Sequence, residues 1–353
     1  TRPDIEAARA ALAALRLPGD ARLEAITSGH VNESWHVHVP GDEVLLQWLN
    51  HGVFPEADAV QDNVETVLDH LDGGMPRLAV PTLRRAVDGA RRVRCESGLW
   101  RAFAWLPGRV VHAWPGDAAL ARAAGVALGA ALHALGALPA DRIRPVLARF
   151  HDLEARLDDL DEVRSGATAQ RLADAAVLLA RVDDEREARR KRAPLALPPR
   201  VLHGDPKFTN FLFPATGTGA VALVDWDTVM VGPLAWDLGD FLRSAACRGG
   251  EDDPGGARVD AELLCAGASG FLEGLAEPLA SAERSALVAA PAHMAFMLAV
   301  RFLTDHLAGD RYFRVRRPRQ NLDRASAQLA LVDGFDAAED VLRRLVEDTD
   351  SEE

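Results

Sequence analysis

The sequence predicts an α+β protein with two lobes, a small β-rich N-terminal lobe and a larger, mainly helical C-terminal lobe. Apolar runs with strand-like alternation lie mostly before residue 106, and helical periodicities dominate after residue 117. Leu106-Pro107-Gly108 interrupts the pattern between them. A length of 353 residues is typical of about two domains. We therefore predict lobes at residues 1–107 and 108–353.

The N-terminal lobe begins with a predicted amphipathic helix from Asp4 to about Leu17, which Pro18-Gly19 ends. Two strands then flank a polar turn at residues 28–32. Alternation of apolar and polar side chains from residue 34 to 39 is typical of a half-buried strand. The other elements predicted in this lobe are strands over 44–49, 78–80, 91–95 and 100–105 and a helix over 55–71.

The C-terminal lobe is predicted to be a set of helices joined by short loops. On one of them, Arg301 and Asp305 stand out among apolar residues, and their spacing of four allows a pair on one face. A structural ion pair and a substrate contact are both open interpretations of these two residues. The predicted helices cover residues 117–135, 150–160, 170–192, 234–243, 261–275, 282–307 and 322–345.

Composition and charge narrow the range of partners. The chain is 48% hydrophobic and 26% charged, as in a globular protein, and its net charge of −13 argues against nucleic acid or an anionic membrane. The chain has three widely spaced cysteines, Cys95, Cys247 and Cys265, which is not the pattern of a disulfide framework. We therefore expect a reducing, cytoplasmic compartment. A polar N-terminus and the lack of an uninterrupted apolar run of about 18 residues predict no membrane span. We expect a monomer or weak homodimer.

Two apolar strands, over 201–202 and 222–224, are each followed by polar residues. Asp205 and Asn210 have four residues between them, and Asp225 ends the second strand. Phosphoryl transfer from a metal-bound nucleotide needs a carboxylate to accept the hydroxyl proton, together with an amide oxygen and a second carboxylate on the metal. This spacing matches a kinase catalytic loop. We therefore predict Asp205 as the base and Asn210 and Asp225 as Mg²⁺ ligands.

Other polar residues of this stretch have predicted supporting roles. Lys207 is expected to reach the transferring γ-phosphate of ATP, and Asp227 is a candidate second carboxylate for the metal. His203 is expected to hold the loop by hydrogen bonding. Any one of these residues could occur by chance, but their order on two apolar strands makes the combination specific.

At these residues the chain resembles the aminoglycoside phosphotransferase and choline kinase-like superfamily, which has a protein-kinase-like fold. That family shows H-[GN]-D, four residues and N, and then an apolar strand ending in D-x-[DE]. The resemblance is closest to the N-acetylhexosamine 1-kinase branch and covers most of the chain. Its further segments are residues 28–34, 46–50, 53–55, 224–232, 237–240, 301–307, 309–313 and 321–322.

The resemblance implies ATP-dependent phosphorylation of the anomeric hydroxyl of an N-acetylhexosamine, with Mg²⁺ as the metal. It implies a set of nucleotide-binding residues and a set of acceptor-binding residues. The first set is Ser28, Gly29, Asn32, Gln47, Glu65 and Trp105, and the second is His30, Asp205 and Arg301.

Three positions depart from the family pattern. Gln47 stands where a kinase strand carries its phosphate-binding lysine, Gly204 where the branch often has Asn, and Trp226 where it often has Leu. Two alternatives therefore stay open. One is a phosphotransferase for an aminoglycoside or another small alcohol. The other is a catalytically silent nucleotide-binding protein, which the missing lysine favours and the intact Asp205, Asn210 and Asp225 oppose.

Overall fold

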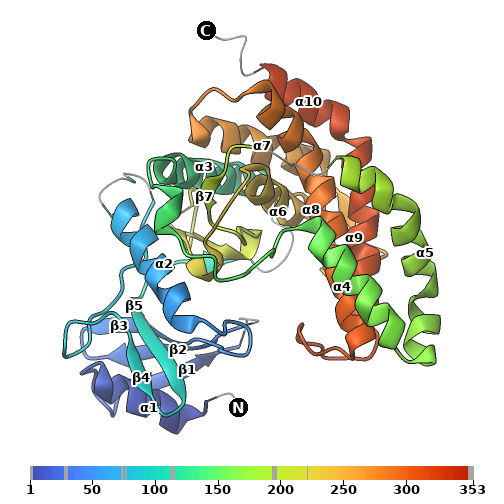
Figure 1. Cartoon of the computed structure of the whole chain (residues 1–353). Helices are drawn as coiled ribbons and strands as arrows, with labels where there is room; N and C mark the ends of the chain where they lie inside the picture. Colours follow the sequence, from blue (N-terminus) through green and yellow to red (C-terminus); the bar gives the residue numbers. More distant parts are fainter. Residues whose placement is uncertain are drawn as a thin grey trace.

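The computed structural model describes residues 3–27, 31–72, 75, 78–111, 116–192, 197–220 and 222–348. The predicted α+β fold is confirmed, because a small lobe with a sheet is followed by a larger helical lobe (Figure 1). The sheet of the small lobe has five antiparallel strands in the order β1-β2-β3-β5-β4. Its strands are β1 (Arg22–Ile26), β2 (Glu33–Val39), β3 (Asp42–Trp48), β4 (Val93–Cys95) and β5 (Gly98–Ala104).

One face of this sheet is covered by α1 (Ile5–Ala14), whose first turn is capped by the Asp4 side chain. The buried face of α1 packs with Trp35 and Val37 of β2 and with Trp100 of β5. Side chains alternate between the two faces of a strand. The even-numbered side chains of β2, from 34 to 38, therefore face the other side of the sheet, toward the larger lobe.

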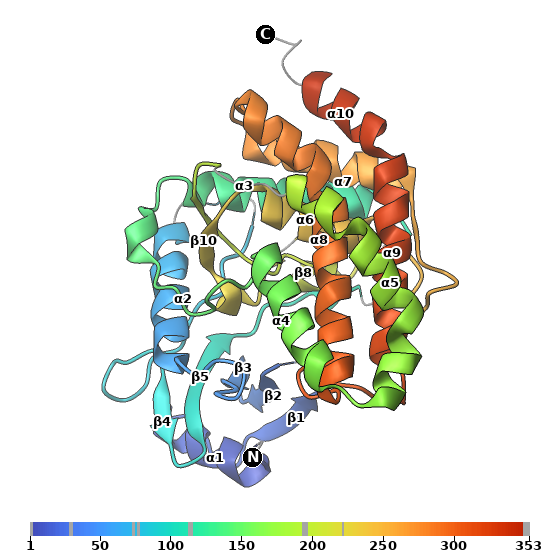
Figure 2. The same ribbon diagram turned by 45° about the vertical axis from the view of Figure 1, so that its right-hand side comes forward.

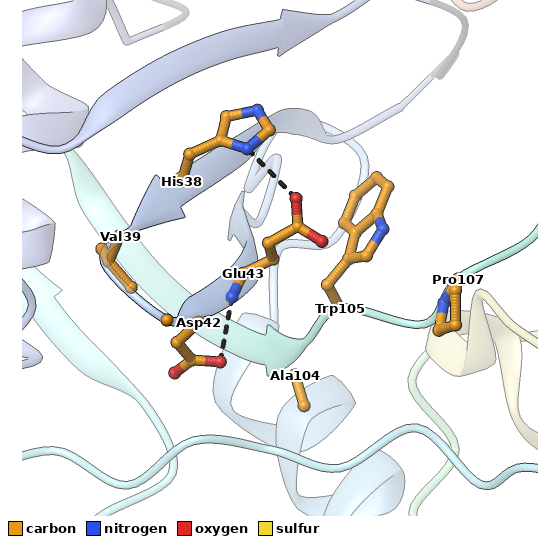
Figure 3. Close-up of a pocket in the computed structure, with 8 residues that line it drawn as sticks. His38, Val39, Asp42, Glu43, Ala104, Trp105 and Pro107 are labelled. Atoms are coloured by element: carbon orange, nitrogen blue, oxygen red, sulfur yellow. Dashed lines mark hydrogen bonds and ion pairs between the residues drawn. The ribbon is translucent and has the colours of Figure 1, made fainter.

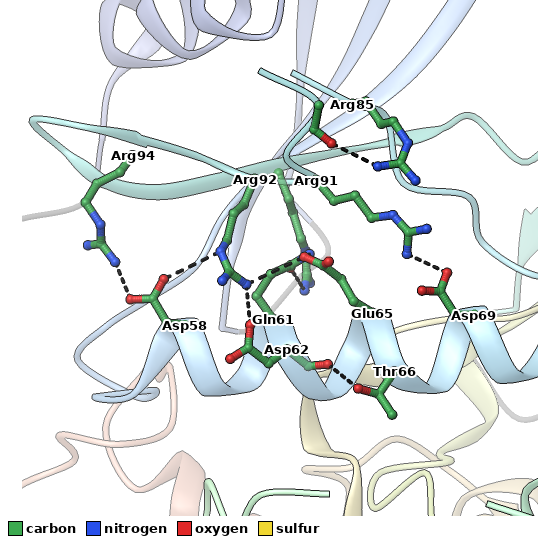
Figure 4. A network of polar contacts seen from close by, with 12 residues as sticks. Asp58, Gln61, Asp62, Glu65, Thr66, Asp69, Arg85, Arg91, Arg92 and Arg94 are labelled. Carbon is green, nitrogen blue, oxygen red and sulfur yellow. Dashed lines mark hydrogen bonds and ion pairs between the residues drawn. The ribbon is translucent and has the colours of Figure 1, made fainter. Parts of the chain in front are cut away.

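Helix α2 (Ala57–Leu71) joins the two lobes. Val64, Val67, Leu68 and Leu71 in its second half belong to the hydrophobic core of the large lobe. Its polar face carries carboxylates that pair with arginines on and beside β4 (Figure 4), such as Asp62 with Arg92 at 2.6 Å and Asp69 with Arg91 at 2.5 Å. The helix is therefore held to the large lobe by apolar contacts and to the small lobe partly by ion pairs.

The large lobe is a pack of helices, of which α4, α5, α8 and α9 lie side by side (Figures 1 and 2). Helices α3 and α7 cross with their backbones in contact, since a Cβ on Gly129 would lie 2.2 Å from the carbonyl oxygen of Phe271. The helices are α3 (Ala118–Leu135), α4 (Leu153–Gly166), α5 (Ala169–Lys191), α6 (Ala235–Ala245), α7 (Ala261–Leu275), α8 (Ser281–Ala308), α9 (Gln320–Ala337) and α10 (Glu339–Asp348).

By length and composition alone, α3 and α8 are apolar enough to cross a membrane. In this fold both are core helices, and 56% and 78% of their most apolar windows are buried inside the protein. Core helices of globular proteins often pass the same compositional test, so this finding carries little weight for a membrane location.

Short strands and 3-10 helices build the region between the lobes. Strands β7 and β10 pair, β6, β8 and β9 form a three-stranded sheet, and β11 pairs with β12. These elements are β6 (Arg109–Val110), β7 (Arg200–Leu202), β8 (Phe211–Phe213), β9 (Ala222–Leu223), β10 (Met230–Gly232), β11 (Cys247–Arg248), β12 (Arg258–Val259), η1 (Ala140–Arg142), η2 (Phe208–Asn210) and η3 (Trp226–Thr228).

Two predicted elements were wrong in detail. Residues 78–80 form no strand, and only Ala79 makes an isolated bridge, to Ala222. The predicted helix over 322–345 is two helices, because the chain leaves helical geometry at Ala338 between α9 and α10. The lobe boundary at residues 107 and 108 stays a prediction.

Candidate active site

A cavity of about 430 Å³ lies between the lobes and is lined by side chains from both. It brings together residues from β1, β2, β3 and β5 and from the segments that follow β7 and β9. Ser28, Gly29 and His30, predicted to contact nucleotide or acceptor, lie outside the described residues. The predicted site residues that line this cavity are Asn32, Gln47, Trp105, Asp205, Lys207, Asn210, Asp225 and Asp227.

The loop from His203 to Phe208 is fixed by side chains that form hydrogen bonds with its backbone. The Asp237 carboxylate at the start of α6 accepts hydrogen bonds from the backbone N–H groups of His203 and Gly204, at 2.8 and 2.9 Å. The imidazole of His151 donates to the Gly204 carbonyl oxygen at 2.7 Å. Burial raises the pKa of Asp237 to about 7, and these two donors work against that shift. Asp237 therefore positions the loop rather than reacting with a ligand.

Gly204 is required by the shape of this loop. Its φ is +85°, a conformation that side chains rarely adopt, and a Cβ there would lie 2.1 Å from the carbonyl oxygen of Thr228. Glycine at this position is thus explained by the close approach of the two chain segments.

His203 connects the same loop to the segment after β9. Its Nε2–H donates to the Val224 carbonyl oxygen at 3.0 Å, and its Nδ1 accepts from the Asp205 N–H at 3.3 Å. Burial lowers its pKa to about 4, so the imidazole is neutral and keeps this tautomer. The predicted role of His203 in holding the loop is confirmed.

Asp205 and Lys207 form an ion pair at the cavity surface, in which the Lys207 ammonium contacts Oδ2 of Asp205. Burial opposes the charge of Lys207, but the carboxylates of Asp205 and Asp225 outweigh it and raise the pKa of the amine. The Asn210 side-chain NH₂ donates to the Asp205 carbonyl oxygen at 2.8 Å. Because the NH₂ group of Asn210 makes this bond within the loop, the side-chain oxygen of Asn210 is the atom that can face a cation.

Asp225 has a backbone conformation that is uncommon for a non-glycine residue. Its φ and ψ are 69° and 57°, in the left-handed region where such residues are often functional. Burial, and then the charge of Asp227, raise the pKa of Asp225 to about 6, while Lys207 and Arg101 act against the shift. A cation bound here would remove that electrostatic penalty, as expected for a metal ligand.

Asp227 lies in a pocket of donors from the small lobe. Its Oδ1 accepts from Arg101 Nη2 and its Oδ2 from Asn32 Nδ2, both at 2.6 Å. The Asn32 side-chain oxygen in turn accepts from the backbone N–H of Asn50. Both carboxylate oxygens of Asp227 are therefore engaged across the gap between the lobes, and its predicted metal role stays a prediction.

Arg101 was missed by the sequence reasoning. It lies on β5 directly opposite Gln47 of β3, is 1% exposed, and donates to Gln47 Oε1 at 3.0 and 3.2 Å and to Gln61 Oε1 at 3.3 Å. Its only sequence signal is a lone charge inside the apolar run 99–103, which indicates a buried, paired cation.

Glu65 and Arg301 are not among the described residues that line the cavity. Glu65, on α2, accepts from Gln61 at 3.0 Å and lies 3.6 Å from Arg92, so it contacts the Arg101 network through Gln61. Its predicted nucleotide contact remains untested. Trp226 is 4% exposed and packs against the ring of His203.

Arg301 stands on the large-lobe side of the loop, surrounded by aromatic rings. Its guanidinium lies 4.4 Å from the ring centre of Phe150 and farther, 5.6 and 5.5 Å, from those of Tyr312 and Phe313. Asp305 accepts hydrogen bonds from the backbone N–H groups of residues 311–313 and from Asn321. Of the two open interpretations of Arg301 and Asp305, the ion pair does not form among the described residues, since each side chain has other partners.

Trp105 begins the connection between the lobes. Its ring stacks on that of His36, with centroids 3.6 Å apart and planes 6° apart, and its backbone N–H donates to the Glu43 carbonyl oxygen at 3.0 Å. An open hollow of about 520 Å³ lies beside it, lined by Trp105, Pro107, His38 and Glu43 among others (Figure 3). Trp105 therefore lines both this hollow and the cavity between the lobes.

The sequence and the fold of this chain are similar to those of known proteins. The sequence model of the phosphotransferase enzyme family matches residues 22–275, which is more than half of the chain. The match contains the whole cavity lining from Ile26 to Thr228 and excludes the helices from α8 onward.

Solved structures with the same fold cover nearly the whole chain. A microcompartment-associated aminopropanol kinase matches with a TM-score of 0.64 and 18% identity over 95% of this chain and 98% of its own. A choline/ethanolamine kinase family protein from Mesorhizobium loti gives 0.62 and 20%, over 97% of each chain. An aminoglycoside phosphotransferase from Alicyclobacillus acidocaldarius gives 0.60 and 18%, over 96% of each. These similarities confirm the two-lobed, kinase-like fold.

Proposed function

The chain belongs to the phosphotransferase enzyme family, and on that premise we propose that it transfers the γ-phosphoryl group of ATP to the anomeric hydroxyl of an N-acetylhexosamine. Phosphoryl transfer to a small molecule follows from the family. ATP, Mg²⁺ and the hexosamine are the proposed part. The observation that carries it is the cavity in which Asp205, Lys207, Asn210 and Asp225 meet.

Asp205 acts as the base in this proposal. It is held by the loop that Asp237, His151 and Gly204 fix, and it accepts the proton of the acceptor hydroxyl late in the transfer. An anomeric hydroxyl is more acidic than other sugar hydroxyls, so its proton is easier to transfer to a carboxylate. Lys207 orients Asp205 through their ion pair and offsets negative charge near the transferring group.

Mg²⁺ would be held by the Asn210 amide oxygen and the Asp225 carboxylate. This donor set of one neutral and one anionic oxygen suits Mg²⁺, which keeps most of its other positions for phosphates and water. The raised pKa of Asp225 and the fixed amide of Asn210 support the assignment. When bound, Mg²⁺ offsets the charge of the nucleotide phosphates.

Arg101 supplies the cation that the third strand lacks. In a kinase a lysine on that strand faces the phosphates, and here the corresponding Gln47 accepts two hydrogen bonds from Arg101 on the next strand. The guanidinium also holds Asp227, and through it the turn that carries Asp225. We assign Arg101 a positioning role for that turn, which makes the missing lysine compatible with catalysis.

The acceptor proposal rests on the resemblance and on one electrostatic feature. Arg301 lies close enough to Asp205 for their opposite charges to attract. Burial is the largest influence on Arg301 and lowers the pKa of its guanidinium. A fixed guanidinium on the acceptor side disfavours a polycationic aminoglycoside and suits a neutral N-acetylated sugar. Another small alcohol, such as an amino alcohol, is the main competing acceptor class.

A panel of acceptors tests the proposal. The protein is incubated with Mg-ATP and N-acetylglucosamine, N-acetylgalactosamine, glucosamine, choline, aminopropanol or an aminoglycoside, and ADP release is measured. We expect the two N-acetylated sugars to stimulate release most, and their product to be acid-labile and to lack a free reducing end. Equal or greater stimulation by an amino alcohol or aminoglycoside would reject the hexosamine assignment. No stimulation by any acceptor would favour a catalytically silent protein.

A further inference from the structure

Two histidines and two glutamates lie together on the face of the small-lobe sheet that is turned away from α1. Glu24 of β1 is opposite His36 of β2 in the strand register, and His38 of β2 is opposite Glu43 of β3. Opposite residues, and residues two apart on one strand, point to the same face. Three neighbouring strands therefore present two imidazoles and two carboxylates side by side.

The distances among these side chains are those of a nearly assembled metal site. His38 Nε2 lies 3.7 Å from Glu24 Oε2, and one ligand atom from each of Glu24, His36 and His38 lies within 4.8 Å of the others. Bonds of about 2.0–2.2 Å in a tetrahedral Zn²⁺ site put ligand atoms roughly 3.3–3.6 Å apart. Small side-chain rotations are enough to bring the three onto one ion.

Both Nε2 atoms are unsatisfied. Those of His36 and His38 are shielded from solvent and make no well-aligned hydrogen bond among the described residues. The nearest carboxylate oxygens lie 3.4 Å from His36 Nε2, on Glu43, and 3.7 Å from His38 Nε2, on Glu24. Buried polar atoms are normally paired, so these two nitrogens are candidate ligand atoms. The ring centroids of His36 and His38 are 3.9 Å apart, which is close enough for both imidazoles to bind the same ligand.

A neighbouring carboxylate favours the metal-binding tautomer of His38, and a neighbouring ring fixes the orientation of His36. Glu43 Oε1 lies 3.1 Å from His38 Nδ1 and can only accept, so Nδ1 carries the hydrogen and Nε2 keeps its lone pair. A carboxylate placed behind a histidine in this way is a common feature of metal sites. Trp105 stacks on His36 and fixes its ring plane.

We propose that Glu24, His36 and His38 bind one divalent transition-metal ion of the Zn²⁺ class, with Glu43 orienting His38. Two imidazole nitrogens and one carboxylate oxygen suit Zn²⁺, Co²⁺, Ni²⁺ or Cu²⁺ and not Mg²⁺. The two glutamates balance the charge of the ion.

The site is accessible and separate from the reaction. Glu24 and Glu43 are about half exposed, at 46% and 49%, and the hollow lined by His38 and Glu43 opens beside them (Figure 3). Arg22 contacts Oε1 of Glu24 and leaves Oε2 facing His38. The ligands are not among the residues assigned to phosphoryl transfer, so the inference stands or falls independently of the proposed function.

Metal titration of the full chain tests the site. Zn²⁺ binding is measured by calorimetry and Co²⁺ binding by visible absorption, without nucleotide and with excess Mg²⁺ to fill the oxygen site at Asp225. We expect one Zn²⁺ per chain in the micromolar range or tighter, and a Co²⁺ spectrum of four-coordinate intensity. Glu24→Gln, His38→Gln and His36→Phe should each weaken binding at least tenfold, and Glu43→Gln about 10–100-fold. Phenylalanine at 36 keeps a ring against Trp105.

His133→Gln is the matched control, since His133 is also exposed beside a carboxylate, Glu277, but as a pair and not a cluster. It should bind Zn²⁺ like the wild type and show the same metal-dependent rise in Tm. Glu24→Gln removes an exposed ligand with no core contact, so it tests the site even if a histidine variant folds poorly. Wild-type binding no tighter than that of Glu24→Gln, or a Co²⁺ spectrum unchanged by it, would overturn the proposal.

Discussion

Arg101 and Asp227, 126 residues apart in the chain, form a buried ion pair of 2.6 Å between the two lobes. Their side chains are 2% and 3% exposed. Losing one partner of such a pair leaves an uncompensated buried charge and costs about 3–5 kcal/mol. The pair is therefore a strong constraint on where the segment from Asp225 to Asp227 lies relative to the sheet.

The role of Arg101 is tested by transferring its positive charge from β5 to residue 47 on β3. Arg101→Gln should weaken Mg-nucleotide binding about tenfold or more, because a charge-assisted hydrogen bond contributes about 1.5–3 kcal/mol. The double variant Gln47→Lys with Arg101→Gln should recover most of that affinity, since residues 47 and 101 are opposite in the register. Equilibrium binding of a non-hydrolysable ATP analogue gives the readout. Arg94→Gln, an exposed arginine on β4, is the control. Failure of the double variant to bind better than Arg101→Gln would contradict the assignment.

Asp205→Asn should lower turnover about 10²–10⁴-fold, the usual contribution of a general base. The change is nearly isosteric and leaves Asn210 and Asp225 in place, so the affinity for Mg-ATP should change less than about threefold. Steady-state rates and nucleotide binding are measured on the same preparation, with the exposed Asp69→Asn as control. Unchanged turnover would rule out Asp205 as the base.

Gly204→Ala and Gly217→Ala separate backbone strain from steric clash. Both glycines have positive φ, but a Cβ at 204 would lie 2.1 Å from the Thr228 carbonyl oxygen, whereas the nearest atom to one at 217 is 3.9 Å away. Gly217→Ala should lose only the conformational cost of about 1–2 kcal/mol. Gly204→Ala should lose more stability and also turnover, because the clash displaces Asp205. Chemical denaturation and rate measurements check this, and equal losses in the two variants would show that the close approach does not matter.

Arg301→Met should raise the KM for the acceptor and leave the KM for ATP nearly unchanged. The guanidinium packs on Phe150 and Tyr312, and methionine keeps the apolar contact without the charge. In the proposed function Arg301 contacts the acceptor, and it is not among the described residues that line the cavity between the lobes. A parallel rise in both KM values would instead indicate a general structural role.

His293→Leu should make the protein more resistant to acid. Burial lowers the pKa of this histidine from 6.5 to about 4. Between those values the unfolded chain takes up a proton that the folded protein does not, so the free energy of unfolding falls as the pH is lowered from about 6.5 to about 4. The pKa shift corresponds to about 3 kcal/mol. Between pH 6.5 and pH 4 the free energy of unfolding should therefore fall by about 3 kcal/mol less in the variant than in the wild type. Denaturant titrations from pH 7 to 4 measure it, with His133→Gln as control, and parallel curves would contradict the prediction.

The sequence predicted the order and nature of most elements because long apolar periodicities are set locally. Residues 78–80 were predicted as a strand on a three-residue apolar run, which is too short to carry a period. The break at Ala338 was missed because alanine favours helix and gives no stop signal.

The site could be predicted where its residues are close in sequence, as Asp205, Lys207 and Asn210 are. Arg101 could not be assigned, because its partners Gln47 and Asp227 are fixed only by strand register and by packing between the lobes. Sequence spacing also paired Arg301 with Asp305, although the backbone of residues 311–313 folds back and takes the carboxylate.

The shared helix α2 limits how the protein can be dissected. Its second half contributes Val64, Val67 and Leu71 to the core of the large lobe, while its first half packs against Leu49 and Leu99 of the small lobe. A fragment ending at Pro107 would leave that second half exposed to water, and the complementary fragment would lack one wall of its core. We therefore expect neither half to be soluble when expressed alone, and expect the two lobes to be inherited and exchanged between relatives as one unit.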